Sequence, residues 1–323
     1  MKNKHNDKRS AKQTLLRRTE FSMIVIIAIL FLIAAVGTKN FLTAYNLTNI
    51  LKQSSIIGII AIAETCIIIT GGIDISCGAV VGMSTLVVTM AQGRWGLSIP
   101  AAICLALISG LLCGALNAVL VHEFNVTPFV ATLGTQTIIR GLIKVYSNGG
   151  TVSGLKPEFS SFASSSFGIL PNLSVVWIAI AIIMFLVLRY TVYGRNLFIL
   201  GSGKEVTRLN GISIRKVNYQ VYIMAGLLYA ISGILLAARI NCAVPTAGEA
   251  YETNAIAASV LGGASLSGGL GSVLGTMLGT LLIILIDNVG TQFGINTFIM
   301  QVVTGCVIVI AIIVDQLKKR RGR

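Results

Sequence analysis

Long apolar segments recur along most of the chain, separated by short polar or glycine-containing stretches. About 20 apolar residues are needed for a helix to cross the hydrocarbon core of a bilayer, and several of these segments are somewhat shorter. The pattern predicts ten membrane-spanning helices. They cover residues 21–37, 54–70, 77–92, 99–121, 128–143, 173–189, 217–238, 253–267, 271–289 and 297–316.

Two glycine-containing breaks interrupt this pattern, one in each half of the chain. The first is Ile69-Thr70-Gly71-Gly72-Ile73-Asp74-Ile75-Ser76, and the second covers residues 261–269. Irregular backbone and a carboxylate are costly in lipid, so such breaks persist only where protein or water surrounds them. Paired broken segments in the two halves of a membrane protein indicate a transport path.

The composition fits an integral membrane protein. Only 11% of the 323 residues are charged, against about 25% in soluble domains, and the mean hydropathy is +0.85. We therefore predict an all-α integral membrane protein with about ten transmembrane helices and glycine-broken segments.

Glycines four residues apart, as in Gly110-x-x-x-Gly114, predict close helix packing. The six cysteines lie mostly in apolar runs without metal-ligand spacing, which favours buried apolar residues over a disulfide framework or a metal site.

The placement of the positive charge predicts the topology. The net charge is +14, and 18 of the 25 Lys and Arg residues lie in or beside residues 1–20, 190–216 and 318–323. By the positive-inside rule all three regions are cytoplasmic, which requires an even number of spans. We expect two basic tails, 1–20 and 318–323, around a single transmembrane domain, 21–317. The tails could also bind membrane lipid, whereas nothing in this placement favours nucleic acid.

The opposite side is predicted from loops with few basic residues. Residues 144–168 and 241–254 are therefore expected outside.

The two halves of the chain also contain similar segments. Residues 71–76 are similar to 262–267, and residues 124–130 are similar to 293–299. The second pair falls on opposite sides of the membrane, as an inverted repeat of spans 2–5 and 7–10 would require. Chance coincidence in apolar sequence is the alternative.

Several short motifs follow one another in a fixed order. They are Gly71–Ser76, Pro128–Thr135, Arg140-Gly141-Leu142, Tyr193-Gly194-Arg195, Asn210-Gly211-Ile212, Pro245–Gly248, Ala255–Ala258 and Leu261–Gly271. In their order and spacing the chain resembles the monosaccharide-type permeases of ATP-binding-cassette importers, the family of the ribose permease. One departure is Asn254, where members of that family often carry an acidic residue.

The resemblance implies a ten-helix permease subunit in the cytoplasmic (inner) membrane, with both termini in the cytoplasm. It implies a second permease subunit, identical or different, around a central path. It also implies cytoplasmic ATP-binding-cassette ATPases and an extracytoplasmic sugar-binding protein that delivers a pentose or hexose. No cofactor is expected in this chain, because ATP is held by the partner ATPases and no G-x-x-x-x-G-K-[ST] motif occurs.

The resemblance implies a role in ATPase docking for the basic loop 190–216. Importer permeases carry a short cytoplasmic coupling helix with a Glu, two small residues and a Gly six positions after the Glu. Glu205 and Gly211 have that spacing, although Val206 and Thr207 replace the usual alanines. Glycines before and after the helix can supply left-handed backbone at its ends. The residues expected to dock on the ATPase are Gly203, Glu205, Arg208 and Gly211; an ordinary solvated loop is the alternative.

Polar residues on apolar segments are the candidates for the path. Asp74 either contacts sugar hydroxyls or caps the third span, where it would accept hydrogen bonds from free backbone N–H groups. Glu64 is an intramembrane carboxylate that either lines the path or pairs with a neighbouring helix. For Asn117, Thr132, Gln136 and Gln301, hydrogen bonding between helices is the other interpretation. The candidate path residues are Glu64, Asp74, Ser76, Thr132, Gln136, Ser265 and Gln301.

We therefore expect the membrane subunit of an ATP-driven sugar importer, working by alternating access and performing no covalent chemistry. No catalytic residue and no metal ligand is predicted. Autoinducer-2 and branched-chain amino acids are alternative cargoes of related permeases. An ion-coupled secondary transporter would need carboxylates in its core, for which the candidates are Glu64, Asp74 and Asp287. A membrane receptor or scaffold would have little use for paired glycine breaks.

Overall fold

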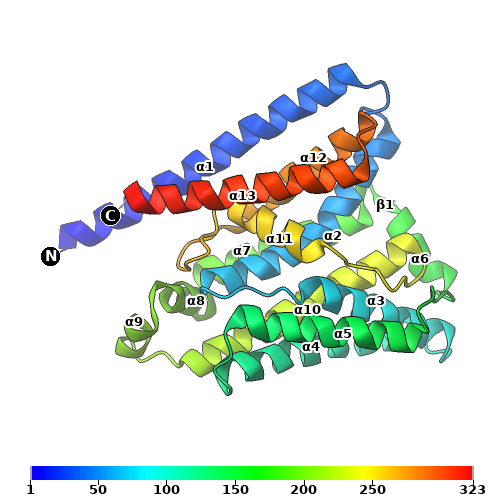
Figure 1. The fold of residues 1–323 in the computed structure, drawn as a ribbon, viewed down its shortest axis with the longest axis horizontal. Coiled ribbons are helices and arrows are strands. Elements are labelled where there is room, and N and C mark those ends of the chain that lie inside the picture. The colour runs from blue at the N-terminus through cyan, green and yellow to red at the C-terminus, as the bar shows by residue number, and fades with distance from the viewer. Residues whose placement is uncertain (1, 322–323) are drawn as a thin grey trace.

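The computed structural model describes residues 2–321, and it describes side chains for residues 20–313 except 297, 308 and 311. The described chain is almost entirely helical (Figure 1). Its helices are α1 (Lys2–Gly37), α2 (Ala44–Ile69), α3 (Cys77–Gly93), α4 (Ile99–His122), α5 (Pro128–Ser147), α6 (Pro157–Ser164), α7 (Asn172–Tyr190), α8 (Val192–Ser202), α9 (Lys204–Leu209), α10 (Ile214–Ile240), α11 (Tyr251–Leu261), α12 (Val273–Gln292) and α13 (Thr297–Arg321). Strands β1 (Ser166–Phe167) and β2 (Leu170–Pro171) form a small antiparallel hairpin.

The helical pattern confirms the predicted fold class. Each of the ten predicted segments contains a helix, and six helices of the described chain are long and apolar enough to cross a membrane. These six are α1 from Glu20, α2, α4, α7, α10 and α12. The count of ten complete spans is therefore approximate, and α11 shows where it fails.

The predicted span 253–267 is not a complete span. Helix α11 has 11 residues and ends at Leu261, after which Gly263 adopts a positive φ of 92°. At 1.5 Å per residue an 11-residue helix is about 16 Å long, roughly half the hydrocarbon thickness. The glycine pair after Leu261 ends the helix because it provides backbone that an α-helix cannot continue through.

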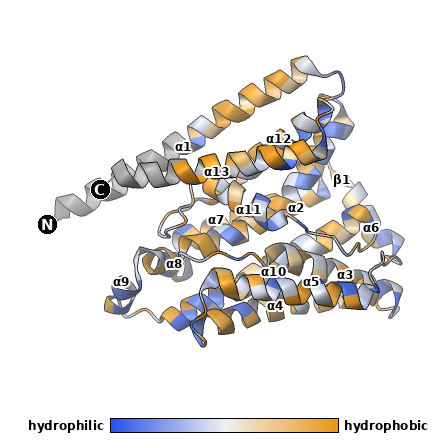
Figure 2. Cartoon of the chain, in the orientation of Figure 1, coloured by the Kyte–Doolittle hydropathy of each residue, from blue (hydrophilic) through white to orange (hydrophobic). Residues whose placement is uncertain are grey.

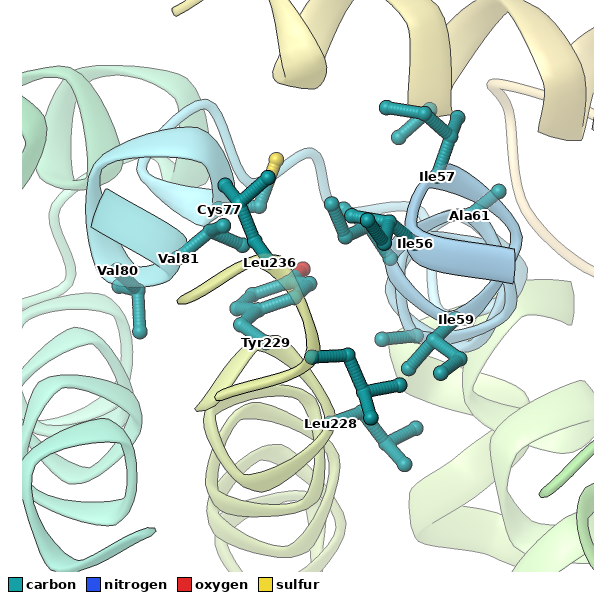
Figure 3. Close-up of a cluster of buried hydrophobic side chains, with 14 of the residues drawn as sticks. Ile56, Ile57, Ile59, Ala61, Cys77, Val80, Val81, Leu228, Tyr229 and Leu236 are labelled. Carbon is teal, nitrogen blue, oxygen red and sulfur yellow. The ribbon is translucent and has the colours of Figure 1, made fainter. Parts of the chain in front are cut away.

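Helix α2 forms the centre of the structure. From Ser54 to Ile69 every one of its residues is buried, as expected for a helix that is apolar on all sides. Figure 3 shows Ile56 and Ile59 of α2 facing Leu228 and Tyr229 of α10. The core is thus built between α2, α3 and α10, whereas α1 and α13 lie at its edge and carry many exposed apolar side chains. The described parts of both helices are largely hydrophobic (Figure 2).

Small residues bring α4 and α10 into backbone contact. A Cβ atom added at Gly110 or Gly114 of α4 would overlap the α10 backbone at Gly226 or Tyr222. Such close approach increases van der Waals contact between helices, which drives their association in lipid. The predicted packing role of the Gly110-x-x-x-Gly114 pattern is confirmed.

The two ends of the bundle carry different elements. The termini lie at the same end as α8 and α9, whereas α6 and β1 lie at the opposite end (Figure 1). Residues 144–168, predicted to be an external loop, contain α6 and pair with the α10–α11 connection through the Val152–Ala243 bridge. The basic tails predicted at 1–20 and 318–323 fall, apart from Glu20, outside the side chains that the structure describes.

The similar segments 124–130 and 293–299 lie at opposite ends of the bundle. Residues 124–130 cover the α4–α5 connection and the start of α5, and the preceding Glu123 pairs with Arg215 at the start of α10, close to α9. Residues 293–299 cover the α12–α13 connection and the start of α13, and Phe293 packs against Gly37 at the far end of α1. This arrangement supports the predicted inverted repeat.

Candidate functional site

The first break is held by hydrogen bonds to Asp74. Its Oδ1 atom accepts from the backbone N–H of Ser76 at 2.8 Å and from the Ser76 hydroxyl at 2.6 Å. Asp74 is 1% exposed, and Ser76 is completely buried immediately before the first residue of α3. The carboxylate therefore closes a local turn from Asp74 to Ser76 and fixes the backbone of the break just ahead of α3, whereas Ser76, at the cap position, makes no side-chain hydrogen bond to the first turn of that helix.

Glu64 ties the same break to two helices. Its Oε1 accepts from the backbone N–H of Asp74 at 3.1 Å, and its Oε2 accepts from the hydroxyl of Tyr229 on α10 at 3.1 Å. Glu64 and Tyr229 are both buried. Each carboxylate oxygen has a donor, so Glu64 links α2, the break and α10 in one network.

Two further helices reach the break through polar side chains. Asn117 of α4 donates from Nδ2 to the Ser76 hydroxyl at 2.9 Å and to Asp74 Oδ2 at 3.4 Å. Thr132 of α5 accepts through Oγ1 from the backbone N–H of Ile75 at 3.1 Å. Glu64, Asp74, Ser76 and Thr132 are thus brought together by five elements of the fold. These contacts match the structural alternative for Asp74 and the interhelical one for Asn117 and Thr132.

The second break lies against the first. The backbone N–H of Gly269 donates to the carbonyl of Ile69, the last residue of α2, at 2.8 Å. Ser265, predicted for the path, is 2% exposed within this break, and its hydroxyl has no hydrogen-bond partner among the described residues. The two glycine breaks, which are far apart in the chain, therefore form one structural unit.

Helix α8 joins this unit through Gly201. A Cβ atom at Gly201 would overlap the Ile69 carbonyl and the Gly269 backbone nitrogen. Gly268, with φ of 81°, also packs against Gly201. Only one residue separates the end of α8 from α9. The backbone crossing of Gly201, Ile69 and Gly269, called the glycine joint below, thus connects the breaks to the predicted coupling loop.

Helix α9 projects as a short knob at one end of the bundle (Figure 1). Gly203 before it has φ of 140° and Gly211 after it has φ of 68°, so both predicted glycines do adopt backbone that favours glycine. Glu205 and Arg208 are exposed, as is 83% of Leu209. Thr207 is completely buried and donates to the Gly203 carbonyl at 2.8 Å, which explains why a larger residue than alanine fits there.

The remaining two path candidates lie outside the network. Gln136 of α5 is half-buried and donates from Nε2 to Glu252 of α11 at 3.3 Å. Gln301 is exposed on α13, away from the break network. The structure therefore separates the seven candidates into a buried network, the adjoining second break, a polar contact on α5 and one exposed side chain.

Sequence reasoning did not assign roles to Tyr229, Arg140, Glu252 or Gly201. Arg140 carried a usable signal, because it is a lone charge within an apolar segment. Glu252 was assigned only to an external loop, yet Ala247 and Gly248 just before it are buried against α3. Residues 241–254 are thus only partly a loop outside the bundle. Tyr229 and Gly201 gave no signal, since their partners are distant in the chain.

The cysteines and possible metal ligands add no second site. Cys66 and Cys77 are buried as predicted, whereas Cys104 and Cys306 are exposed on the surfaces of α4 and α13. Among the described residues no group of three His, Cys, Asp or Glu side chains could hold a metal ion.

Comparison with known proteins identifies a family. Residues 46–312 match the family model described as branched-chain amino acid transport system / permease component. The chain is 38% identical over 293 residues to the ribose import permease protein RbsC of Bacillus subtilis, with 90% of each chain covered.

Other relatives are similar over nearly the whole chain. Identity to the ribose import permease protein RbsC of Escherichia coli (strain K12) is 38% over 304 residues, covering 91% of this chain and 93% of that protein. Identity to the galactose/methyl galactoside import permease protein MglC of Haemophilus influenzae is 32% over 322 residues, covering 94% and 95%. No solved structure matches the chain.

Proposed function

The chain belongs to the family of branched-chain amino acid transport system permease components, and from this premise we propose that it moves a monosaccharide across the cytoplasmic membrane as the permease subunit of an ATP-binding-cassette importer. The names of its relatives, which specify ribose and galactose or methyl galactoside, favour a pentose or hexose. The chain itself carries out no covalent chemistry in this proposal. Cytoplasmic ATPases bind and hydrolyse ATP, and the permease converts their movement into alternating access.

The observation that carries this proposal is the glycine joint. Broken helices near the middle of a bundle are typical of transporters, whose two access states differ by movement around such breaks. Here both breaks meet in one backbone hydrogen bond, Gly269 N–H to the Ile69 carbonyl at 2.8 Å. Gly201 of α8 packs on this bond, and the exposed α9 knob follows directly. Movement of α9 against an ATPase would therefore reach both breaks through a few residues.

The remaining assignments follow from the same proposal. A second permease subunit, identical or different, completes the path, and an extracytoplasmic binding protein delivers the sugar. The end of the bundle that carries α8, α9 and the termini faces the cytoplasm, in agreement with its basic residues. Glu64, Asp74, Ser76, Thr132 and Ser265 shape the breaks, whereas Gln136 is a better candidate for contact with the solute. Gln301 is exposed on α13 and would meet the second subunit or lipid.

Reconstitution tests this function. A tagged chain is purified from its native membrane, and the ATPase that copurifies with it is identified. The complex is then placed in proteoliposomes with its binding protein. We expect ATP hydrolysis and uptake of labelled ribose or galactose to rise together. Uptake driven by a proton or sodium gradient without ATP would contradict the importer class, and ATP-driven uptake of leucine or autoinducer-2 in place of sugars would contradict the cargo.

A further inference from the structure

A stripe of polar side chains runs along α5. Gln136, Arg140 and Lys144 are spaced four residues apart, so they lie along one side of the helix. Gln136 and Arg140 are half-buried, and Lys144 is exposed. Helix α5 has 20 residues but is not among the helices of the described chain that are apolar enough to be membrane spans. We call these three residues the α5 polar stripe.

The stripe indicates which side of α5 faces away from lipid. Intramembrane charged side chains are rare because lipid cannot solvate them, and they face the protein interior or a water-filled cavity. Lys144 is near the end of α5 and can extend its amine to the interface. Arg140 lies seven residues before the end of the helix, too far from the interface for its side chain to reach it in the same way. Arg140 is partly exposed as a residue but its Nη2 atom is buried, so its side of α5 faces the protein interior or a water-filled space and not lipid.

Arg140 and Gln136 contact the connection that leads into α11. Arg140 donates from Nη1 to the carbonyl of Ala247 at 2.6 Å, and Gln136 donates from Nε2 to Glu252 Oε1 at 3.3 Å. Two glycines of α3 leave room for these side chains, since Glu252 Oε2 lies against Gly78 and Arg140 Nη1 lies beside Gly82. Three elements, α3, α5 and α11, thus surround one polar cluster.

The cluster contains one unused donor and one unused acceptor. Arg140 Nη2 and Glu252 Oε2 are buried atoms without a hydrogen-bond partner among the described residues. Unpaired buried polar atoms are destabilising, the more so on charged groups, and each needs a physical explanation. Both residues are partly exposed as a whole, so the cluster is not sealed within the bundle interior. An alcohol group accepts one hydrogen bond and donates another, which complements this donor–acceptor pair.

We propose that Gln136, Arg140 and Glu252 form a binding station for a polyhydroxylated solute on the translocation path, reached along the α5 polar stripe. Arg140 donates a hydrogen bond to a hydroxyl oxygen of the solute, and Glu252 accepts a hydrogen bond from a hydroxyl group. Gln136 orients the Glu252 carboxylate. The identity of the solute rests on the proposed function, whereas the water-lined side of α5 does not.

Thiol labelling tests the water-lined side without any transport assay. Gln136→Cys and Arg140→Cys are made in the complex, after serine replaces the native cysteines that are not fully buried. Those cysteines are Cys104, Cys113, Cys242 and Cys306. We expect a membrane-impermeant, positively charged thiol reagent to label Gln136→Cys at least about tenfold faster than Ile138→Cys, which is an exposed apolar position on the same helix. Equal rates at the two positions would overturn the assignment, even if Arg140→Cys failed to assemble.

Uptake by the reconstituted complex tests the binding station. Glu252→Gln removes the charged acceptor, and we expect the maximal rate of ribose or galactose uptake to fall about tenfold. Glu249→Gln is the matched control, because Glu249 is exposed three residues earlier in the same connection and should keep the normal rate. Equal rates for the two variants would overturn the station. If the unmodified complex transports neither sugar, the proposed function fails, while the labelling result still decides the path.

Discussion

Asp74 lies at the centre of the first break, where it is buried and hydrogen-bonded to residues of the break and of two helices. Its position ahead of an apolar segment predicted a helix cap as one of two roles, because carboxylates accept hydrogen bonds from free N–H groups. In the structure its Oδ1 atom accepts from the N–H and O–H of Ser76, the residue that precedes α3, and so fixes the break itself and not the first turn of the helix. Its other partners, Glu64 through the backbone and Asn117 through the side chain, lie on different helices. Such partners could not be identified from one sequence, since nothing local specifies which helix faces make contact.

Replacing Asp74 separates the need for a hydrogen-bond acceptor in the break from a requirement for charge. Asp74→Asn keeps an acceptor for Ser76, so we expect assembly and uptake close to normal. Asp74→Ala leaves the Ser76 donors and Asn117 unpaired in a buried site, and we expect the free energy of unfolding to fall by about 3 kcal/mol. Denaturant titration in mixed micelles measures both variants. Loss of uptake in a stable Asp74→Asn protein would instead indicate a role for the charge.

Two buried tyrosines of α10 provide a matched pair. The Tyr229 hydroxyl donates to Glu64 at 3.1 Å, whereas the Tyr222 hydroxyl has no hydrogen-bond partner among the described residues. Tyr229→Phe leaves Glu64 Oε2 without this donor and should lower the free energy of unfolding by about 1–3 kcal/mol. Tyr222→Phe removes an unpaired hydroxyl and should be neutral or stabilising. The same denaturant titration compares them, and equal losses would contradict the assigned hydrogen bond.

At the scale of elements, the apolar pattern predicted where helices occur better than where they cross the membrane. All ten apolar segments contain helices, because burying backbone in lipid leaves few other conformations. Helix α11 ends at Leu261 because the Gly262-Gly263 pair follows, although Ala264, Ser265 and Leu266 continue a mildly apolar composition. Composition alone counts such residues as part of a span, whereas the backbone conformation of glycine ends the helix.

The glycine joint makes a prediction about α8. Gly201→Ala places a methyl group against the Ile69 carbonyl and Gly269, and overpacking of this kind costs about 1–3 kcal/mol. We expect reduced thermal stability in detergent and weaker stimulation of ATP hydrolysis by the solute. Gly141→Ala of α5 is the control, because nothing lies within 4 Å of its added Cβ atom. That change should be neutral or stabilise the helix by about 0.5–1 kcal/mol. Equal effects of the two changes would exclude a special role for the joint.

At the scale of the whole molecule, the sequence predicted that the basic loop and the two termini share one end, but not which distant segments meet. The basic loop and the two tails suggested one shared end, and α8, α9 and the termini do lie together (Figure 1). The contact between the two breaks was not predicted. The two breaks are similar in sequence, but similarity between two segments does not indicate that the segments are in contact.

The α9 knob gives a prediction about assembly. Leu209 is 83% exposed on the knob, and burying such a side chain against an ATPase would contribute to docking. Leu209→Asp should therefore lower solute-stimulated ATP hydrolysis at least about tenfold while membrane insertion stays normal. Ile169→Asp is the control, since Ile169 is 98% exposed in the β1–β2 turn at the opposite end. A normal response in Leu209→Asp would remove α9 from the ATPase contact.

The glycine joint also has a consequence for biosynthesis. Its hydrogen bond connects residues 69 and 269, so the donor of this bond is synthesised 200 residues after its acceptor, the carbonyl at the end of α2. At about 5–20 residues per second, a ribosome takes roughly 10–40 s to reach that donor. During this interval the hydrogen bonds of Glu64 with the Asp74 N–H and of Asp74 with Ser76 can already form, whereas the bond to Gly269 cannot. The first break therefore has a polar network of its own before the second break is made and completes the joint.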